Sequence, residues 1–364
     1  MRFIQIIYFG LLINFSLTST IFAKQIHVAF LGPELGQSAY WDSVIAPLKT
    51  VAEQFDIKLT LHHANWNDRF DYYPKAKELF ESEDKPDYLI STFRGASAKH
   101  FLELVESHQV PFISIVTGVP KFEQKKVGVP QQHYKYWLAQ ILADDFESGF
   151  LLTNALIART KNNEEKGVSL IAVGGDQLLA SSNSRDKGLY QAIERNKNVE
   201  FLQLVHSNWN VAITKRMIRQ LMSRYQSSDI IWAANDDVAI AAYQSLKSLN
   251  VDKKNMPIIG GVDWTIKGLE AIVADKIQVS VGGNHMHGVW ALILVNDIAH
   301  GLTLTNRKGY TYKTPFAVAD KKNAGKILAF LKAEQWREVD FKQFSKFYND
   351  QVEEYDFNFI KLVL

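Results

Sequence analysis

The sequence predicts an α/β fold divided between two lobes. The chain has 364 residues, which is more than one hydrophobic core usually organises. Short apolar runs alternate with stretches of helical periodicity, and this alternation predicts βαβ units with a mostly parallel sheet flanked by helices. The alternation occurs twice, on either side of a polar stretch at 117–132 that contains Gly and Pro. We therefore expect one such sheet in each lobe.

The first array begins with a predicted strand at 26–32, which ends at Gly32 and Pro33. Residues 43–55 follow as a predicted helix, because their apolar residues recur every three or four positions. The next expected elements are a strand at 57–63, a helix at 73–83, a strand at 88–92, a helix at 98–107 and a strand at 111–116.

The second array follows the stretch 117–132, which we interpret as the first crossing between the lobes. Its expected elements are a helix at 136–160, a strand at 168–174, a helix at 185–195, a strand at 199–206, a helix at 212–225, a strand at 229–234, a helix at 238–249 and a strand at 256–262. After these we expect a helix at 266–274, a strand at 277–282, a helix at 286–300 and a strand-like stretch at 310–318. A polar and aromatic tail ends the chain, and its aromatic cluster is predicted to pack across the hinge or on the second lobe: Phe341, Phe344, Phe347 and Tyr348.

These elements suggest a division of the chain between the lobes. We expect residues 25–131 and 264–301 to form the N-terminal lobe. Residues 132–263 and 302–364 are expected to form the C-terminal lobe and the tail. The chain then passes between the lobes three times.

The first 23 residues have the pattern of a secretory signal peptide. Arg2 supplies a short basic region, an apolar stretch runs to about Leu17, and Ala23 is a plausible last residue before cleavage. The alternative is an uncleaved membrane anchor, since the apolar run is close to the lower length limit for a membrane span. Asn14 and the Ser/Thr patch after it interrupt the run and favour cleavage.

Composition excludes several functional classes. The net charge is +2, which gives no electrostatic case for binding nucleic acid or an acidic membrane surface. There are no cysteines, so disulfides, thiolate metal sites, cysteine nucleophiles and lipid attachment through an N-terminal cysteine are all absent. An exported chain without disulfides fits the periplasm.

Four segments, in this order and at this spacing, resemble the type I periplasmic binding proteins, the family that includes the ribose- and galactose-binding proteins. They are residues 38–41, residues 87–90, residues 184–188 with 192–193, and residues 235–242. The resemblance covers nearly the whole mature chain, and within the family the spacing and tail look closest to the autoinducer-2 receptor.

The resemblance implies two lobes joined by a three-stranded hinge. It implies a periplasmic protein, with no cofactor, that captures a sugar or sugar-like polar ligand between the lobes and presents it to an ABC transporter. The alternative is a periplasmic receptor that partners a membrane sensor kinase. An exported enzyme remains a further alternative. A transcription regulator of related fold would need an N-terminal helix-turn-helix where the signal peptide stands.

Candidate ligand-binding residues follow the predicted strands, because ligands of open α/β sheets bind beyond the carboxyl ends of the strands. Ser38 and Trp41 follow the first strand, where Trp41 could stack on a ligand or belong to the core. Arg185 follows a strand and a Ser/Asn-rich loop, and its planar fork suits a diol. The family has an arginine here that grips ligand hydroxyls; the alternative is a surface pair with Asp186 or Glu194.

Two more strand ends carry acidic and amide side chains. Asn235 and Asp236 end an apolar run and begin a helix, so each could cap the helix, and Asp236 is predicted to accept a hydrogen bond from the ligand. Asp263 follows Gly261 at the point where the family has an aspartate, and it is predicted to contact ligand; the alternative is a hinge-turn role. Asp145 matches a family position with a structural role in the hinge.

Two candidates depart from the family pattern. Asn284 follows Gly282 and Gly283, near the position where sugar-binding relatives have Gln and the autoinducer-2 receptor has Arg. Arg94 stands where sugar binders often have Asp or Asn, and an additional arginine in the cleft would suit an anionic ligand or a borate-like diol adduct. The alternative for Arg94 is a solvated loop position.

The remaining motifs argue against catalysis and metal binding. His62 and His63 lie on one strand and point to opposite faces, and His285 and His287 have no carboxylate cluster at ligand spacing. No phosphate loop, dinucleotide fingerprint or nucleophile elbow is present. We therefore expect no metal site and no enzymatic activity.

Overall fold

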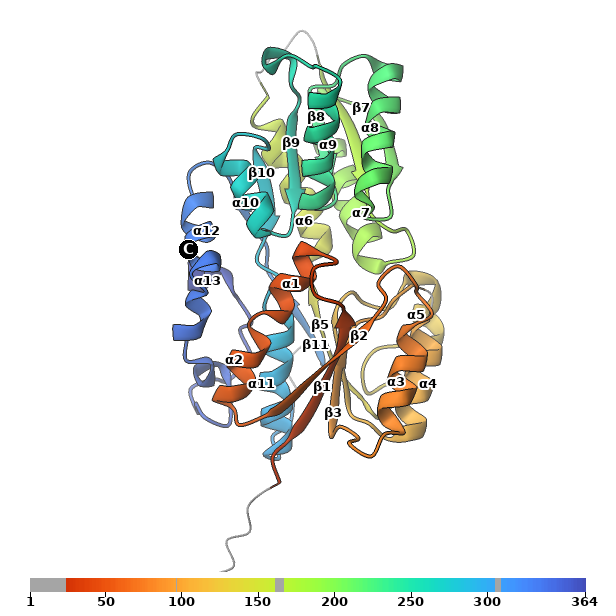
Figure 1. The fold of residues 1–364 in the computed structure, drawn as a ribbon, viewed down its shortest axis with the longest axis vertical. Coiled ribbons are helices and arrows are strands. Elements are labelled where there is room, and N and C mark those ends of the chain that lie inside the picture. The colour runs from red at the N-terminus through yellow and green to blue at the C-terminus, as the bar shows by residue number, and fades with distance from the viewer. Residues whose placement is uncertain (1–23, 96, 161–166, 305–308) are drawn as a thin grey trace, which may run out of the picture.

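The computed structural model describes residues 24–95, 97–160, 167–304 and 309–364, so the predicted signal peptide at 1–23 lies outside the described residues. Two sheets of six strands each form two lobes, one above the other in Figure 1. The predicted α/β fold class is confirmed.

The first sheet has the order β11-β5-β4-β3-β1-β2, with every neighbouring pair parallel. Its strands are β1 (His27–Pro33), β2 (Lys58–Ala64), β3 (Tyr88–Ser91), β4 (Phe112–Val116), β5 (Trp137–Ala143) and β11 (Thr311–Thr314). Helices α1 (Ala39–Ile45), α2 (Leu48–Gln54) and α11 (His287–Ala299) pack together on one face, whereas α3 (Tyr72–Phe80), α4 (Ala98–His108) and α5 (Lys121–Val127) cover the other (Figure 1). The predicted helix at 43–55 is thus two helices, with Pro47 between them.

The second sheet has the order β12-β10-β9-β8-β6-β7, in which only the β10–β12 pair is antiparallel. Its strands are β6 (Val168–Gly174), β7 (Val199–His206), β8 (Ile230–Ala233), β9 (Ile258–Val262), β10 (Val279–Gly282) and β12 (Ala317–Ala319). Helices α6 (Asp145–Ile157) and α7 (Ala180–Arg195) pack against each other on one face, and α8 (Val211–Tyr225), α9 (Asp236–Ser248) and α10 (Ile266–Val273) follow one another on the other.

The chain passes between the sheets three times. The crossings run from β5 to α6, from β10 to α11 and from β11 to β12. The predicted division of the chain differs from this at three places. Residues 137–143 and 311–314 pair in the first sheet, not the second, and residues 266–282 belong with the second sheet, not the first. The polar stretch 117–132 is therefore not a crossing; it lies within the first lobe and contains α5.

The predicted helix at 136–160 is wrong in its first half. Residues Trp137–Ala143 form β5, which pairs with β4 on one side and β11 on the other. The helix α6 begins only after Asp144, whose side chain accepts a hydrogen bond from the Glu147 backbone N–H at 3.3 Å. Local periodicity pointed to a helix, but pairing with two strands distant in sequence decides the conformation of this segment.

The C-terminal tail contacts both lobes. Helix α12 (Ala324–Lys332) packs on α10 of the second lobe, and a short 3₁₀ helix at Phe341–Phe344 packs on α2 and α11 of the first. Trp290 of α11 lies edge-on to Phe344, with ring centroids 5.1 Å apart. Buried Asp297 accepts hydrogen bonds from the tail, including one from the Tyr355 hydroxyl at 2.7 Å. The aromatic cluster therefore packs on the first lobe, and its predicted place across the hinge or on the second lobe is wrong.

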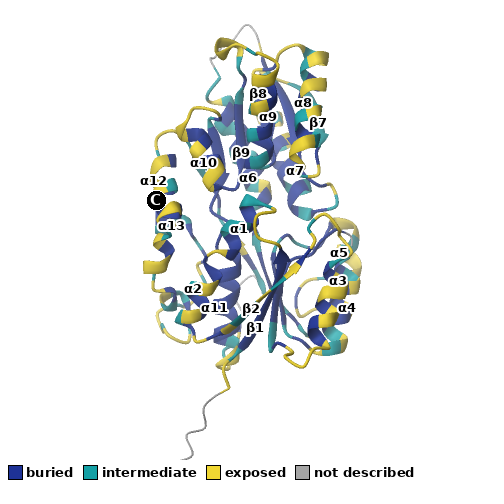
Figure 2. Cartoon of the chain, viewed as in Figure 1, coloured by how far each residue is buried: buried dark blue, intermediate teal, exposed yellow. Residues whose placement is uncertain are grey.

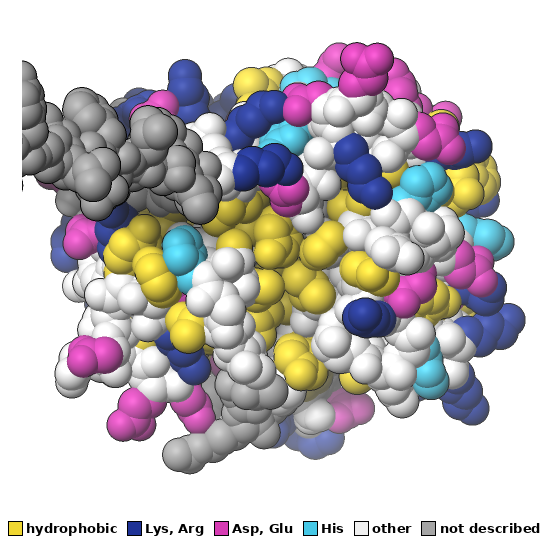
Figure 3. Space-filling view, turned by 90° about the horizontal axis from the view of Figure 1, so that it is seen from below, with side chains coloured by type: hydrophobic (Ala, Val, Ile, Leu, Met, Phe, Trp, Pro, Cys, Tyr) yellow, Lys and Arg dark blue, Asp and Glu magenta, His cyan; other side chains and the backbone are white. Residues whose placement is uncertain are grey.

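The central strands of both sheets are buried, the edge strands β2 and β7 are only partly buried, and many exposed residues lie on the outer faces of the helices (Figure 2). Seen from the end of the first lobe, acidic and basic side chains are interspersed around a central apolar area (Figure 3). Within the described residues, no helix has both the length and the apolar character needed to cross a membrane.

Candidate ligand-binding site

The carboxyl ends of strands from both sheets face one another across a small cavity of about 70 Å³. In parallel sheets, the loops that follow these strand ends are where ligands bind. Eleven residues line the cavity: Ser38, Tyr40, Trp41, Trp66, Thr117, Leu179, Ser181, Arg185, Trp209, Asn235 and Asp263. The first five come from the first lobe and the other six from the second.

Arg185 is fixed on the floor of the cavity. Its Nε donates to Asp145 Oδ1 at 2.9 Å, Nη1 donates to the Ala234 carbonyl at 2.6 Å, and Nη2 lies 3.4 Å from Asp263 Oδ1. Only 6% of the residue is exposed. The predicted alternative was a surface ion pair of Arg185 with Asp186 or Glu194. Arg185 is instead buried, and Asp186 pairs with His206 at 2.8 Å. Arg185 can still offer its remaining guanidinium N–H groups to hydroxyl oxygens.

Close packing of α6 on α7 sets the position of Arg185. A Cβ at Gly149 of α6 would lie 2.0 Å from the Arg185 carbonyl oxygen, so only glycine permits this approach. The first turn of α6 carries Asp145, and the packing therefore brings this carboxylate to the guanidinium.

Burial alters the protonation of the carboxyls around Arg185. Loss of solvent raises the pKa of Asp263 to about 8, even though the Arg185 charge acts to lower it. Burial likewise raises the pKa of Asp145, and there too Arg185 opposes the shift. Both shifts favour the protonated carboxyl, and Asp145, at 2.9 Å, is the nearer acidic partner of the guanidinium.

Asp263 also has a strained backbone. Its φ is 118°, and that of the next residue, Trp264, is 53°. Such angles are costly for residues with side chains, and strained residues of this kind gather at functional sites. The strain makes Asp263 a candidate for a role in the cavity, and the hinge-turn alternative stays open.

Aromatic rings form the walls. In the first lobe, the ring centroids of Trp41 and Trp66 are 5.5 Å apart and those of Tyr40 and Trp41 are 5.7 Å apart. In the second lobe, the Trp209 ring lies against Arg185, with its centroid 5.8 Å from the guanidinium carbon. Such faces suit the C–H surface of a ring-shaped polar ligand.

Two residues that line the cavity carry a buried polar atom without a hydrogen-bond partner. The Tyr40 hydroxyl and Trp209 Nε1 are both buried without a partner among the described residues. Burial raises the pKa of Tyr40 well above its usual range, so this hydroxyl is a neutral donor. Because a buried, unsatisfied polar group costs free energy, these two atoms are candidates for contact with a ligand.

Contacts between the lobes hold the cavity closed. Arg94 Nη1 of the first lobe lies 2.8 Å from Asp176 Oδ2 of the second, and both side chains are nearly buried. The guanidinium also lies 4.5 Å from the Trp66 ring centroid. Asp176 therefore balances the charge of Arg94, and neither the predicted solvated position nor a free cation for an anionic ligand is found.

Five of the eight predicted residues line the cavity: Ser38, Trp41, Arg185, Asn235 and Asp263. Trp41 is at once a wall residue and part of the core. Asn235 also caps α9 by accepting a hydrogen bond from the Val238 N–H at 2.9 Å.

Asp236 and Asn284 do not line the cavity. Asp236 accepts hydrogen bonds from the Thr265 backbone N–H at 2.8 Å and from the Ser280 hydroxyl at 2.6 Å, so its carboxylate is committed to the interior of the second lobe. The prediction that Asp236 accepts a hydrogen bond from the ligand is therefore corrected. Asn284 is buried beside Tyr40, with its Oδ1 unpaired.

The sequence analysis missed several lining residues, of which Trp66 and Trp209 are the most informative. Trp66 follows β2 and Trp209 follows β7, so the strand-end rule that selected Trp41 selects them as well when it is applied to every strand. Among the described residues, no group of three or more His, Asp or Glu side chains could hold a metal ion.

Residues 28–295 match the family model described as "Periplasmic binding protein domain", which spans most of the chain. The chain belongs to this family, and the fold is that of the type I, two-lobed periplasmic binding proteins.

Individual relatives are more distant. The chain is 27% identical to a putative rhizopine-binding protein of Rhizobium meliloti over 145 residues, which are 39% of this chain and 45% of that protein. The match thus spans less than half the length of this curated relative.

Among solved structures, a periplasmic sugar-binding protein from Pseudomonas fluorescens has a TM-score of 0.77 at 24% identity, covering 92% of this chain and 97% of its own. A solute-binding protein of an ABC transporter from Bacillus halodurans, with bound myo-inositol, has a TM-score of 0.69 at 16% identity. The match covers 84% of this chain and 98% of that protein. At these identities the two structures establish the shared fold.

Proposed function

We propose that this chain is a periplasmic solute-binding protein that captures a neutral sugar or sugar-like polyol between its lobes and presents it to an ABC transporter. The observation that carries the proposal is the cavity itself. Unpaired donors on Tyr40 and Trp209, the fixed fork of Arg185 and three tryptophan rings converge there. Polyols offer hydroxyl groups for such donors and C–H faces for such rings.

Charge favours a neutral ligand. Arg185 is paired with Asp145 and Arg94 with Asp176, so neither of these two arginines is free for a phosphate or carboxylate group. The names of similar proteins agree with this chemistry: one is a putative rhizopine-binding protein, and solved structures contain myo-inositol or D-allose.

Transport is the favoured outcome of capture. Three of the similar structures are described as solute-binding proteins of ABC transporters. The alternative of a receptor that partners a sensor kinase has no corresponding support. Capture without chemical change is part of the proposal, because the polar groups around Arg185 are committed to holding one another and show no nucleophile paired with a base.

Calorimetric titration of the mature protein with myo-inositol, D-allose, L-arabinose and D-galactose tests the proposal. We expect saturable binding of at least one of them, a change in tryptophan fluorescence and recovery of the ligand unchanged. Absence of binding across a wide polyol panel, or conversion of the ligand to a product, would reject the proposed function.

A further inference from the structure

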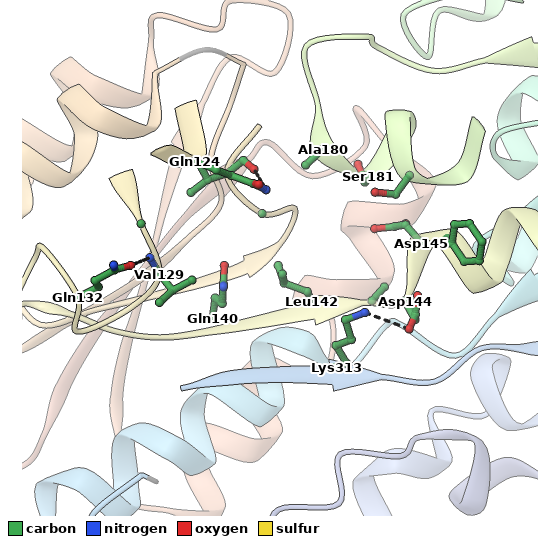
Figure 4. A pocket seen from close by; sticks show the side chains of 16 residues that line it. Gln124, Val129, Gln132, Gln140, Leu142, Asp144, Asp145, Ala180, Ser181 and Lys313 are labelled. Atoms are coloured by element: carbon green, nitrogen blue, oxygen red, sulfur yellow. Dashed lines mark hydrogen bonds and ion pairs between the residues drawn. The ribbon is translucent and has the colours of Figure 1, made fainter. Parts of the chain in front are cut away.

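A second pocket lies between the lobes, next to the cavity, and β5 and β11 form one of its sides (Figure 4). Its volume is about 430 Å³. From the first lobe it is lined by the segment 118–132, by β5 and by Lys313, and from the second lobe by the start of α6 and of α7. Because both lobes contribute, the pocket forms only when they close.

This pocket and the cavity are neighbours that share a lining residue. Ser181 lines both spaces, and its backbone N–H lies 3.4 Å from Thr117 Oγ1 across the gap between the lobes. This distance is long for a hydrogen bond. A ligand that spanned both spaces could replace the contact, since its oxygens could accept from Ser181 N–H and pair with the Thr117 hydroxyl.

Three glutamine side chains give the pocket its chemistry. Gln124 donates its Nε2 to the Val119 carbonyl at 3.0 Å, Gln140 donates its Nε2 to Thr311 Oγ1 at 2.8 Å, and Gln132 accepts from the Val129 N–H at 3.2 Å. Each amide uses one end in these bonds, which leaves the other end for an occupant. Figure 4 shows Gln140 pointing into the space between the lobes. Amide groups that both donate and accept match hydroxyl groups, which do the same.

The charged side chains of the pocket are paired. Lys313 Nζ lies 3.2 Å from Asp144 Oδ2, and Asp145 binds Arg185 at 2.9 Å. No charge is therefore left to attract an ionic group, so the lining favours a neutral occupant. Leu142 and Val129 add apolar surface for its C–H faces.

Size indicates how the two spaces are used. The cavity measures about 70 Å³, whereas ligand sites usually measure about 300–1,000 Å³, so a bound ligand needs space beyond the cavity. The second pocket lies within that range. We propose that it is a subsite for a neutral hydroxylated substituent, such as a second sugar, joined to the ring held in the cavity. This inference rests on the proposed function and names its ligand as a glycoside or similarly substituted polyol.

Ser184 allows the subsite to be blocked alone. It lines the second pocket but not the cavity, and it lies in α7. Ser184→Leu would fill part of the pocket. Lys187→Leu, at an exposed position of the same helix, is the matched control.

The first probe is the polyol or sugar that binds in the calorimetric panel. The other probes are the same compound with a galactosyl group on each hydroxyl in turn. Myo-inositol and galactinol are an example of such a pair. We expect one galactosylated form to bind about tenfold more tightly than the bare ring. Ser184→Leu should abolish this gain without weakening binding of the bare ring, and Lys187→Leu should change neither.

Three results would overturn the inference: no galactosylated form binds more tightly than the ring, the gain survives in Ser184→Leu, or Lys187→Leu abolishes it equally. Each leaves the proposed function intact, because the ring still binds. Failure of every ring and glycoside to bind would instead reject the proposed function, and the subsite with it.

Discussion

Tyr40 places a hydroxyl group in the cavity that no other described residue satisfies. Its removal should change the stability of the folded protein little, because the side chain of Asn284 lies close to the hydroxyl but no well-formed hydrogen bond joins them. Ligand binding should suffer, since the hydroxyl is expected to donate to the ligand. We predict that Tyr40→Phe raises the dissociation constant about 3- to 10-fold, measured by calorimetry.

Tyr72→Phe is the control for this change. Tyr72 is also buried with an unpaired hydroxyl, but it begins α3, packs in the core of the first lobe and does not line the cavity. Its substitution should leave affinity unchanged. Equal effects of the two substitutions would show that Tyr40 does not contact the ligand.

Two buried carboxyls make the stability of the protein depend on pH. Burial raises the pKa of Asp236 to about 7 and that of Asp263 to about 8 in the folded protein, whereas both ionise near pH 4 when unfolded. Between these values the folded state binds more protons than the unfolded state, so the free energy of unfolding falls as pH rises. We predict a decrease on the order of 2 kcal/mol from pH 6 to pH 8, measured by urea denaturation. Asp263→Asn should make the slope shallower, and a stability that rises over this interval would contradict the assignment.

At the residue scale, the strand-end rule selected loops that line the cavity but not every lining side chain. Arg185 and Asp263 were selected because they follow strands and match a family pattern. Asp236 was misassigned because adjacent residues in a first helical turn point about 100° apart, and sequence does not show which of them faces the cavity. Trp209 was missed because its loop matched no motif.

At the scale of the elements, the close packing of α6 on α7 matters most for the position of Arg185 in the site. Gly149→Ala would place a Cβ 2.0 Å from the Arg185 backbone oxygen, so the helices would have to move apart. We predict a loss of about 1–3 kcal/mol in the free energy of unfolding, together with weaker ligand binding because Arg185 shifts. Thermal and urea denaturation, followed by titration, measure the two effects.

Gly325→Ala in α12 is the matched control. The added Cβ meets no atom within 4 Å, so the substitution should be neutral or stabilise the helix by up to about 1 kcal/mol. If Gly149→Ala were equally harmless, the close approach of α6 and α7 would not position the site.

Most elements could be predicted from the sequence because their periodicity and strand-ending glycines are local signals. The exceptions depend on partners distant along the chain. Residues 137–143 become a strand only because β4 and β11 flank them, and the stretch at 310–318 divides into β11 and β12 of different sheets. Neither fact can be derived from a local pattern.

At the scale of the whole molecule, the ion pair between Arg94 and Asp176 links the two lobes. Asp176→Asn removes the charge but can keep the bond that Oδ1 accepts from the Leu178 N–H at 2.9 Å. We predict a larger radius of gyration for the unliganded variant in small-angle X-ray scattering and an affinity about 5- to 30-fold lower, because less of the protein is closed.

Glu270→Gln is the control. It removes an exposed ion pair with Lys332 and should change neither the radius of gyration nor the affinity for the ligand. If Asp176→Asn scattered like the unaltered protein and bound ligand as tightly, the Arg94–Asp176 pair would have no part in closure.

The most direct measurement is a crystal structure with the tightest ligand of the polyol panel. We predict density for an unmodified ligand between the lobes, in hydrogen-bond contact with Arg185 and the Tyr40 hydroxyl and against the Trp209 ring. A ligand bound to one lobe alone, or outside the gap between the sheets, would contradict the proposal that the strand ends of the two lobes hold it together.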